Sequence, residues 1–232
     1  MKNLSIIIPA YKEIENLHLL LPQIYNETES LNIDYEVLVV DSNEFCELTN
    51  NLCSKFIKFK YINRSPKNNY GDAVRSGIRE SMGKYIIFMD ADGSHTPSFL
   101  KILYDNRNNG DIVIASRYTE GGKTDNGMLL IFMSYVVNKL YSFILNLDVK
   151  DVSNSFKLYK SSHLKKLNLD CENFDIVEEV LYKCKLNFPT IKFIEIPYTF
   201  KKRIHGSTKR NLLLFVITFA VTLFKLRFSK KK

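Results

Sequence analysis

Short apolar segments alternate with segments of helical spacing along the first half of this 232-residue chain, and no other feature constrains the fold as strongly. Strand-like apolar runs cover residues 4–8, 35–40, 56–62, 84–89 and 111–115. Residues 13–31 have helical spacing, and further helices are expected from Asp72 to Met82 and after Thr96–Pro97. Strands that alternate with helices predict an α/β fold with a mainly parallel sheet and helices on both of its faces.

The second half of the sequence is less regular. We expect strands over residues 156–159 and 191–196, helices over 128–147 and 174–186, and a mobile loop over 121–127. Residues 128–147 approach the length of a transmembrane helix, but Lys139 near the centre disfavours a span. We therefore predict an amphipathic helix that packs on the domain or lies in a membrane interface.

The basic residues are concentrated at the C-terminal end. Residues 201–232 hold ten Lys and Arg and no Asp or Glu, whereas the other 200 residues hold 23 basic and 25 acidic residues. The charges flank the apolar residues 212–224, which favours an anionic membrane surface as partner and disfavours nucleic acid. We predict a domain over residues 1–210 and a membrane-associating helix over 211–232. A helix packed on the core is the alternative, and the sequence leaves open whether 212–228 spans or lies on the membrane.

The acidic sequence Asp90-Ala91-Asp92 follows the apolar run 84–89. Ligands of open α/β sheets bind outside the carboxyl ends of the strands, so both carboxylates are expected at such a site. Two adjacent carboxylates repel each other unless a positive group lies between them. Mg²⁺ or Mn²⁺ with a diphosphate fits, because hard cations prefer oxygen ligands. We predict that Asp90 and Asp92 bind this metal in an enzyme that uses a nucleoside diphosphate.

Two other predicted strands also end in polar or aromatic residues. The first is followed by Pro9, Tyr11 and Glu13, and the second by Asp41. An aromatic ring can lie against a base, and a carboxylate can accept hydrogen bonds from hydroxyl groups. Asp41 and Glu13 could instead belong to helix N-termini, but acidic groups at the ends of three strands favour a common site. His95, beside Asp92, is expected to be an exposed loop residue.

These residues, in this order, resemble the family-2 glycosyltransferases with the GT-A fold, and in particular dolichyl-phosphate mannose synthases and related polyprenyl-phosphate glycosyltransferases. The likeness continues at Ser116-Arg117-Tyr118 and over residues 151–157 and 200–209, so it covers approximately residues 3–210. Departures from the family pattern are Lys12, Ser42, Ser94 and Ser155. They leave the type of reaction plausible and leave the sugar and the nucleotide undetermined.

The resemblance implies a role for each matching residue. Those expected to contact the nucleoside are Pro9, Tyr11, Glu13 and Asp41. Asp90, Ala91 and Asp92 would hold the metal and the diphosphate. Arg117, Arg203 and Lys209 would surround the phosphates of donor and acceptor, with Asp92 and these three cations as the catalytic set.

The implied reaction is the inverting transfer of a hexose from a nucleoside-diphosphate sugar, of the GDP-mannose or UDP-glucose type, to a polyprenyl or dolichyl phosphate. A phosphate monoester is already anionic near neutral pH, so no strong general base is needed. The enzyme would act at the cytosolic face of a membrane, as a peripheral or C-terminally anchored protein. Two alternatives stay open: transfer to a sugar hydroxyl, with Glu178 or Glu179 as the base, and a non-catalytic module that binds a nucleotide sugar.

Overall fold

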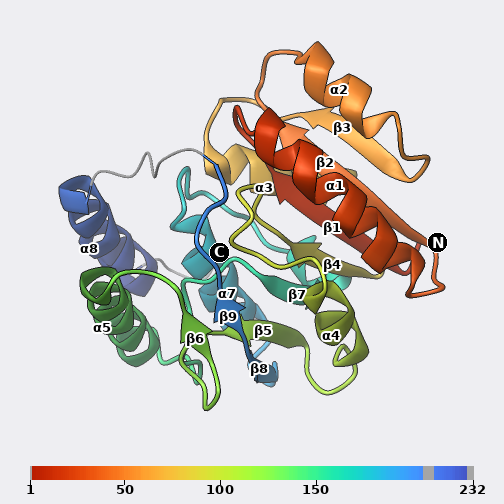
Figure 1. Cartoon of the computed structure of the whole chain (residues 1–232). Coiled ribbons are helices and arrows are strands. Elements are labelled where there is room, and N and C mark those ends of the chain that lie inside the picture. Colours follow the sequence, from red (N-terminus) through yellow and green to blue (C-terminus); the bar gives the residue numbers. More distant parts are fainter. Residues whose placement is uncertain (1, 206–211, 229–232) are drawn as a thin grey trace.

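Seven strands form one sheet in the order β3-β2-β1-β4-β7-β5-β8 (Figure 1). The computed structural model describes residues 2–205 and 212–228, and in the last helix the side chains of Phe219 and residues 221–228. The strands of the sheet are β1 Leu4–Pro9, β2 Tyr35–Asp41, β3 Phe59–Asn63, β4 Tyr85–Phe88, β5 Ile112–Ser116, β7 Lys157–Lys160 and β8 Phe193–Pro197. Strand β7 is antiparallel to β4 and β5, and the other pairs are parallel.

Helices cover both faces of the sheet, as the sequence predicts (Figure 1). One face carries α1 Ile14–Glu29, α2 Glu47–Cys53 and α4 Phe99–Asp105. The other carries α3 Tyr70–Glu80, α5 Met128–Ile144, α6 Ser161–Leu164, α7 Ile176–Asn187 and α8 Leu212–Phe228. Successive strand residues point to opposite faces, so Ile6 and Ile8 pack with α1 while Ile7 packs with α3. Burial on both faces explains why β1, β2, β4 and β5 are largely apolar runs.

Two local predictions were wrong. Asn69, and not Asp72, is the N-cap of α3: its side chain accepts a hydrogen bond from the Asp72 backbone N–H at 2.7 Å. Residues 121–127 are also not only a loop, because they contain β6 Lys123–Thr124, which pairs in parallel with β9 Thr199–Phe200. This small ribbon ties the chain after β5 to the chain after β8.

Helix α8 packs against the domain beside α5 (Figure 1). Its residues Leu223 and Leu226 are buried, and the Phe219 ring meets the Tyr141 ring of α5 at 4.6 Å. Thr222 Oγ1 donates a hydrogen bond to Asp175 Oδ2 at 2.7 Å. The expected alternative of a helix packed on the core is therefore present over the described part of α8.

Over residues 2–205 and 212–228, no helix combines the length and the apolar character that crossing a bilayer requires.

Candidate active site

The carboxyl ends of three adjacent strands bring the predicted acidic residues to one edge of the sheet. Strand β1 ends at Pro9, β2 ends at Asp41, and Asp90 follows β4 by two residues. Since β1 lies between β2 and β4, the turns after these strands are neighbours. The predicted gathering of acids outside the strand ends is the arrangement found.

Asp41 and Tyr11 are held by a buried arginine that the sequence analysis missed. Arg64 Nε donates to the Asp41 carbonyl at 2.8 Å, and its Nη2 donates to the Ala10 carbonyl. Its guanidinium also lies 5.8 Å from the centre of the Tyr11 ring. Burial lowers the pKa of Arg64, although nearby Asp41 opposes this shift. Arg64 follows β3 directly, and this position at a strand end was the available signal.

The Asp90 carboxylate has a side-chain donor on each oxygen. Tyr70 OH donates to Oδ1 at 3.1 Å, and Ser155 Oγ donates to Oδ2 at 3.0 Å. The Tyr70 ring stacks on Phe174 at 4.3 Å, which fixes its direction. Ser155, one of the departures from the family pattern, is therefore part of the acidic site. Tyr70 was not predicted, because its partner is 20 residues away along the chain.

Asp92 is held by its own loop and by a distant arginine. Ser94 donates to Asp92 Oδ1 through its backbone N–H at 3.0 Å and its hydroxyl at 2.6 Å. Arg203 Nε donates to Asp92 Oδ2 at 3.3 Å. Burial by itself raises the pKa of Asp92, but the Ser94 hydrogen bonds and nearby His95 and Arg203 lower it overall. The carboxylate is therefore charged at neutral pH.

His95 is fully buried, so its prediction as an exposed loop residue was wrong. Its Nδ1 accepts a hydrogen bond from the Asp90 backbone N–H at 2.9 Å, and Nε2 lies 3.1 Å from Asn154 Oδ1. The ring stacks on Phe156 at 4.6 Å. Burial lowers the pKa of His95, against the effect of Asp90 and Asp92. With both ring nitrogens bonded, His95 positions the Asp90 backbone and does not point toward a metal.

Arg203 forms ion pairs with both Glu13 and Asp92. Its Nη1 and Nη2 lie 3.1 and 3.0 Å from Glu13 Oε1. The segment that carries it is fixed by the Ile204 N–H, which donates to the Asp92 carbonyl at 2.9 Å, and by the His205 N–H, which donates to Asn16 Oδ1 at 3.1 Å. The structure thus brings together residues that are about 190 positions apart in the sequence. Lys209 lies outside the described residues.

Arg117 lies in the protein interior, in a buried ion pair. Its Nε and Nη2 donate to Asp151 at 2.8 and 2.7 Å, and Nη2 also donates to Ser153 Oγ at 2.9 Å. Asp151 is fully buried, and the Arg117 side chain is 9% exposed. Burial opposes charge on both groups, but their attraction raises the pKa of Arg117 and lowers that of Asp151. Because Nε and Nη2 of Arg117 already have these partners, contact between Arg117 and a phosphate stays a prediction.

Glu178 and Glu179, the alternative bases, lie on α7 and are buried. Glu179 accepts hydrogen bonds from the backbone N–H groups of Asp170 and Cys171, and pairs with Lys183 at 2.8 Å. These contacts anchor the chain before α7. They give Glu179 a structural role, and they do not support Glu179 as a catalytic base.

The oxygen atoms available as metal ligands are of the kind that a hard divalent cation prefers. Asp90 and Asp92 supply carboxylate oxygens, and Asp92 already has a cation, the Arg203 guanidinium, against Oδ2. In the described part of the chain, no group of three or more His, Cys, Asp and Glu side chains is arranged to hold a metal by itself. A diphosphate would therefore have to complete the coordination, as it does at many Mg²⁺ sites.

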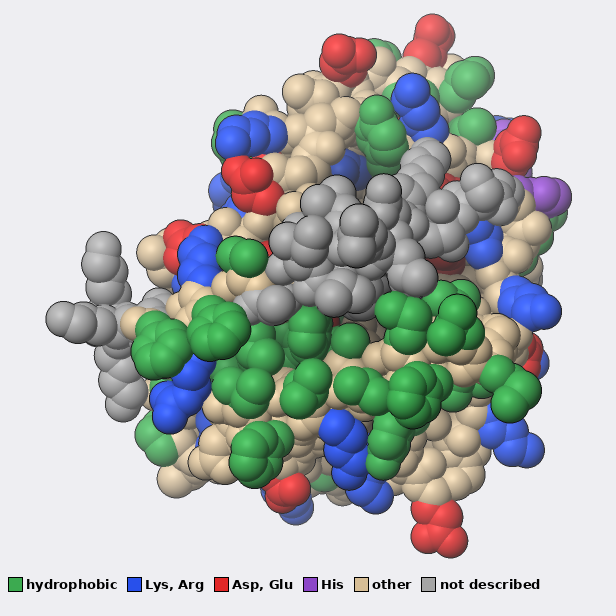
Figure 2. Space-filling model, turned by 90° about the vertical axis from the view of Figure 1, so that its left-hand side faces the viewer, with side chains coloured by type: hydrophobic (Ala, Val, Ile, Leu, Met, Phe, Trp, Pro, Cys, Tyr) green, Lys and Arg blue, Asp and Glu red, His purple; other side chains and the backbone are tan. Residues whose placement is uncertain are grey.

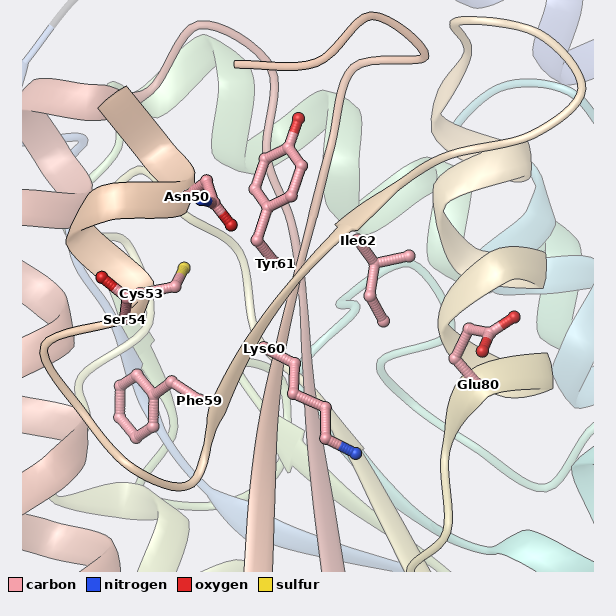
Figure 3. Close-up of a pocket in the computed structure, with 8 residues that line it drawn as sticks. All are labelled: Asn50, Cys53, Ser54, Phe59, Lys60, Tyr61, Ile62 and Glu80. Atoms are coloured by element: carbon pink, nitrogen blue, oxygen red, sulfur yellow. The ribbon is translucent and has the colours of Figure 1, made fainter. Parts of the chain in front are cut away.

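A hollow of about 360 Å³ lies elsewhere, at the outer edge of the sheet (Figure 3). Asn50, Cys53 and Tyr61 lie on the α2 side of β3, and Ile62 and Glu80 lie on its α3 side (Figure 3). Among the described residues, no predicted site residue lines this hollow. It is separate from the acidic site.

The sequence profile of Glycosyl transferase family 2 matches residues 5–167. The chain belongs to glycosyltransferase family 2. The match contains the ends of β1, β2 and β4 and both residues of the Arg117–Asp151 pair. The predicted family is therefore confirmed.

Two curated relatives of this family-2 chain are named as mannosyltransferases of polyprenyl phosphates. The dolichol-phosphate mannosyltransferase of Pyrococcus furiosus is 33% identical over 212 residues, which cover 88% of this chain and 58% of that protein. The undecaprenyl-phosphate mannosyltransferase of Micrococcus luteus is 29% identical over 218 residues, which cover 88% of this chain and 86% of that protein. The chain thus spans less than two thirds of the Pyrococcus relative.

Solved structures confirm the GT-A type of fold. Glucosyl-3-phosphoglycerate synthase from Mycobacterium tuberculosis, in complex with Mn²⁺, uridine diphosphate and phosphoglyceric acid, superposes with a TM-score of 0.74. The alignment covers 100% of this chain and 80% of that one, at 14% sequence identity. At this identity, the likeness establishes the fold of this family-2 chain and nothing finer.

Proposed function

We propose that this protein transfers a hexose from a nucleoside-diphosphate sugar to a polyprenyl phosphate, with inversion at the anomeric carbon. The observation that carries the proposal is the gathering of Glu13, Asp41, Asp90 and Asp92 at the carboxyl ends of three adjacent strands, with Arg203 paired to Glu13 and Asp92. The names of the two relatives support the choice of a polyprenyl phosphate as acceptor.

The residues after β1 and β2 would bind the nucleoside. Tyr11 is partly exposed, with the Arg64 guanidinium 5.8 Å from the centre of its ring, and this ring would lie against the base. Asp41 and Glu13 carry carboxylates that can accept hydrogen bonds from the base or from ribose hydroxyls. Pro9 and the buried Ala91 would shape the backbone around the donor.

Asp90 and Asp92 would hold Mg²⁺ or Mn²⁺. When bound, such an ion stabilises the negative charge that develops on the departing diphosphate. Tyr70 and Ser155 fix the Asp90 carboxylate, and Ser94 fixes that of Asp92, so both acids are oriented in advance. Pre-arranged groups of this kind avoid reorganisation during the reaction.

The attacking atom would be an oxygen of the lipid phosphate. Because this oxygen is anionic near neutral pH, the chain needs a cation to bring it to the donor and needs no base. Arg203 has a planar fork that suits phosphate, and in the structure it is paired with Glu13 and Asp92. A donor that engaged these acids would leave Arg203 available to the lipid phosphate, with Lys209 as a second predicted cation. In-line attack on an α-linked donor would give a β-linked product.

An exposed apolar face over α5 and α8 supports binding to a lipid surface. Hydrophobic side chains gather over α5 and α8 (Figure 2). Those exposed are Met128, Leu129, Leu130, Phe132, Tyr135, Val136, Leu140 and Phe143 of α5, and Val221, Phe224 and Phe228 of α8. The same two helices carry three exposed cations, Lys139, Lys225 and Arg227. Apolar area combined with basic charge favours the interface of an anionic membrane, so we propose peripheral binding at the cytosolic face.

Replacing two exposed rings of α5, Phe132→Ser with Phe143→Ser, should lower the fraction of protein bound to anionic vesicles. Complete burial of such a side chain contributes about 1.5–3 kcal/mol, so partitioning should fall by about tenfold or more. Vesicle flotation measures this. Leu48→Ser with Ile57→Ser is the matched control, because both residues are exposed on or after α2, on the other side of the sheet. Equal losses in the two double variants would contradict a specific membrane face.

The activity itself is tested with labelled GDP-mannose and UDP-glucose, polyprenyl phosphate and Mg²⁺ or Mn²⁺. We expect a labelled, solvent-extractable lipid with one of the donors, and its loss when EDTA removes the metal. The same assay with a polyprenol or glycolipid hydroxyl as acceptor tests the alternative reaction. Transfer to the hydroxyl alone, or donor binding without any transfer, would overturn the proposal.

A further inference from the structure

Helix α5 has a buried amide at its centre, although much of its surface is exposed and apolar. Asn138 is 1% exposed. Its Oδ1 accepts a hydrogen bond from the Ser153 backbone N–H at 2.9 Å, and its Nδ2 donates to the Ser134 carbonyl at 2.7 Å and to Ser153 Oγ at 3.1 Å. A buried polar group is costly unless its partners are in place. Asn138 therefore fixes α5 to Ser153 at one defined position.

Ser153 is in turn part of the loop that holds the acidic site. Its hydroxyl accepts a hydrogen bond from Arg117 Nη2 at 2.9 Å. Two residues later, Ser155 Oγ donates to Asp90 Oδ2 at 3.0 Å. Between them, Asn154 lies 3.1 Å from His95 Nε2, and the same ring accepts the Asp90 backbone N–H. The loop thus contacts the Asp90 side chain through Ser155, and it is connected to the Asp90 backbone through Asn154 and His95.

A second set of contacts leads from α5 to Asp92. Tyr135 of α5 meets Tyr118 at a ring distance of 5.8 Å. The Arg117 guanidinium lies 5.2 Å from the Tyr118 ring and 5.4 Å from the Phe200 ring. Phe200 ends β9 and leads into the segment whose Arg203 and Ile204 bond to Asp92. Both acids of the site are therefore connected to the same helix.

We propose that Asn138 is a positioning residue that couples the seating of α5 on a lipid surface to the binding of the metal–nucleotide at Asp90 and Asp92. This inference rests on the proposed function for the lipid contact. The connection runs through partly or fully buried hydrogen bonds between groups with few rotatable bonds, so a shift of α5 is passed to Ser153 and is not absorbed by a flexible side chain. Coupling between two binding events is reciprocal, so vesicles must change the nucleotide affinity.

The experiment measures the Kd of GDP and of UDP with Mn²⁺, by titration calorimetry, with and without anionic vesicles that contain no polyprenyl phosphate. For the wild type, we expect the two Kd values of the bound nucleotide to differ by about fivefold or more. For Asn138→Ala and Ser153→Ala, the ratio should be close to one. Ser153→Thr keeps the hydroxyl and should keep the wild-type ratio.

Ser142→Ala is the matched control on the same helix. Its hydroxyl donates to the Leu147 carbonyl at 2.5 Å, close to the end of its own helix, and not to Ser153 or Ser155. It should keep the wild-type ratio. Thermal melting is recorded for every variant, and if Asn138→Ala does not fold, Ser153→Ala and Ser153→Thr decide the matter.

A wild-type ratio of one, or alanine variants that keep the wild-type ratio, would overturn the coupling. The assay contains no acceptor, so the absence of lipid-linked product in the transfer assay would remove the proposed reaction and leave this measurement valid. Absence of nucleotide binding by the wild type would remove both.

Discussion

Replacing Asp92 by Asn should reduce sugar transfer by about a thousandfold, because a change of about 4 kcal/mol in barrier height corresponds to this factor. The substitution removes one of the two charges proposed to hold the metal, and the metal's stabilisation of the leaving group amounts to several kcal/mol. It also removes the negative charge that pairs with Arg203. Initial rates with saturating donor, acceptor and Mg²⁺ measure the effect.

Asp105→Asn is the matched control, because it makes the same substitution at a position outside the acidic site. Asp105 ends α4, and its carboxylate pairs with Lys101 one turn earlier, with about half of its side chain exposed. We expect activity within about twofold of the wild type, since exposed ion pairs contribute little. An Asp92→Asn enzyme that folds and retains a tenth of the activity would show that this carboxylate is not central.

The second large effect is on stability. Asp151→Asn should lower the free energy of unfolding by about 3–5 kcal/mol, the usual cost when one partner of a buried ion pair is removed. The substitution leaves Arg117, whose side chain is 9% exposed, without its carboxylate. Urea denaturation at neutral pH, followed by circular dichroism, gives the difference. Asp34→Asn, which affects the exposed pair with Lys2, should cost less than about 1 kcal/mol.

The same pair sets the sign of a pH effect. Although burial opposes it, Arg117 lowers the pKa of Asp151 below its ordinary value. The contribution of Asp151 to stability is therefore fully present above about pH 4, the ordinary pKa of Asp, and is lost as the pH falls through the lower folded value. A loss at pH 7 below about 1 kcal/mol for Asp151→Asn would contradict a stabilising pair.

Local patterns in the sequence were sufficient to predict much of the fold. Strands β1, β2, β4 and β5 are buried on both faces, so each is a largely apolar run, and Asp41, Asp90 and Asp92 stand out at or shortly after the ends of such runs. Helix α2 was not predicted, because its seven residues are too few for a clear periodic pattern. The N-cap of α3 was misplaced because Asn69 and Asp72 are both capping residue types, and only the folded backbone distinguishes them.

The contacts within the site were harder to predict from the sequence, because they depend on partners that are far apart along the chain. His95 was expected at the surface, and only the packing of Phe156 and Asn154 around it makes it buried. Arg64 bonds to backbone carbonyls, which no residue pattern reveals. Arg117 was expected near phosphate because its motif was matched, while its pairing with Asp151 requires the loop before β7 to meet the end of β5.

The reversed direction of β7 has a consequence for how the site is assembled. In a purely parallel sheet, only loops that follow strands reach the carboxyl edge. Because Lys157 at the start of β7 pairs with Phe88 at the end of β4, the connection that enters β7 lies at this edge as well. The chain therefore delivers Asp151, Asn154 and Ser155 straight from α5 without an additional crossover. Changes in the length of this connection should alter the acidic centre and the lipid-facing helix together, while leaving the strand order unchanged.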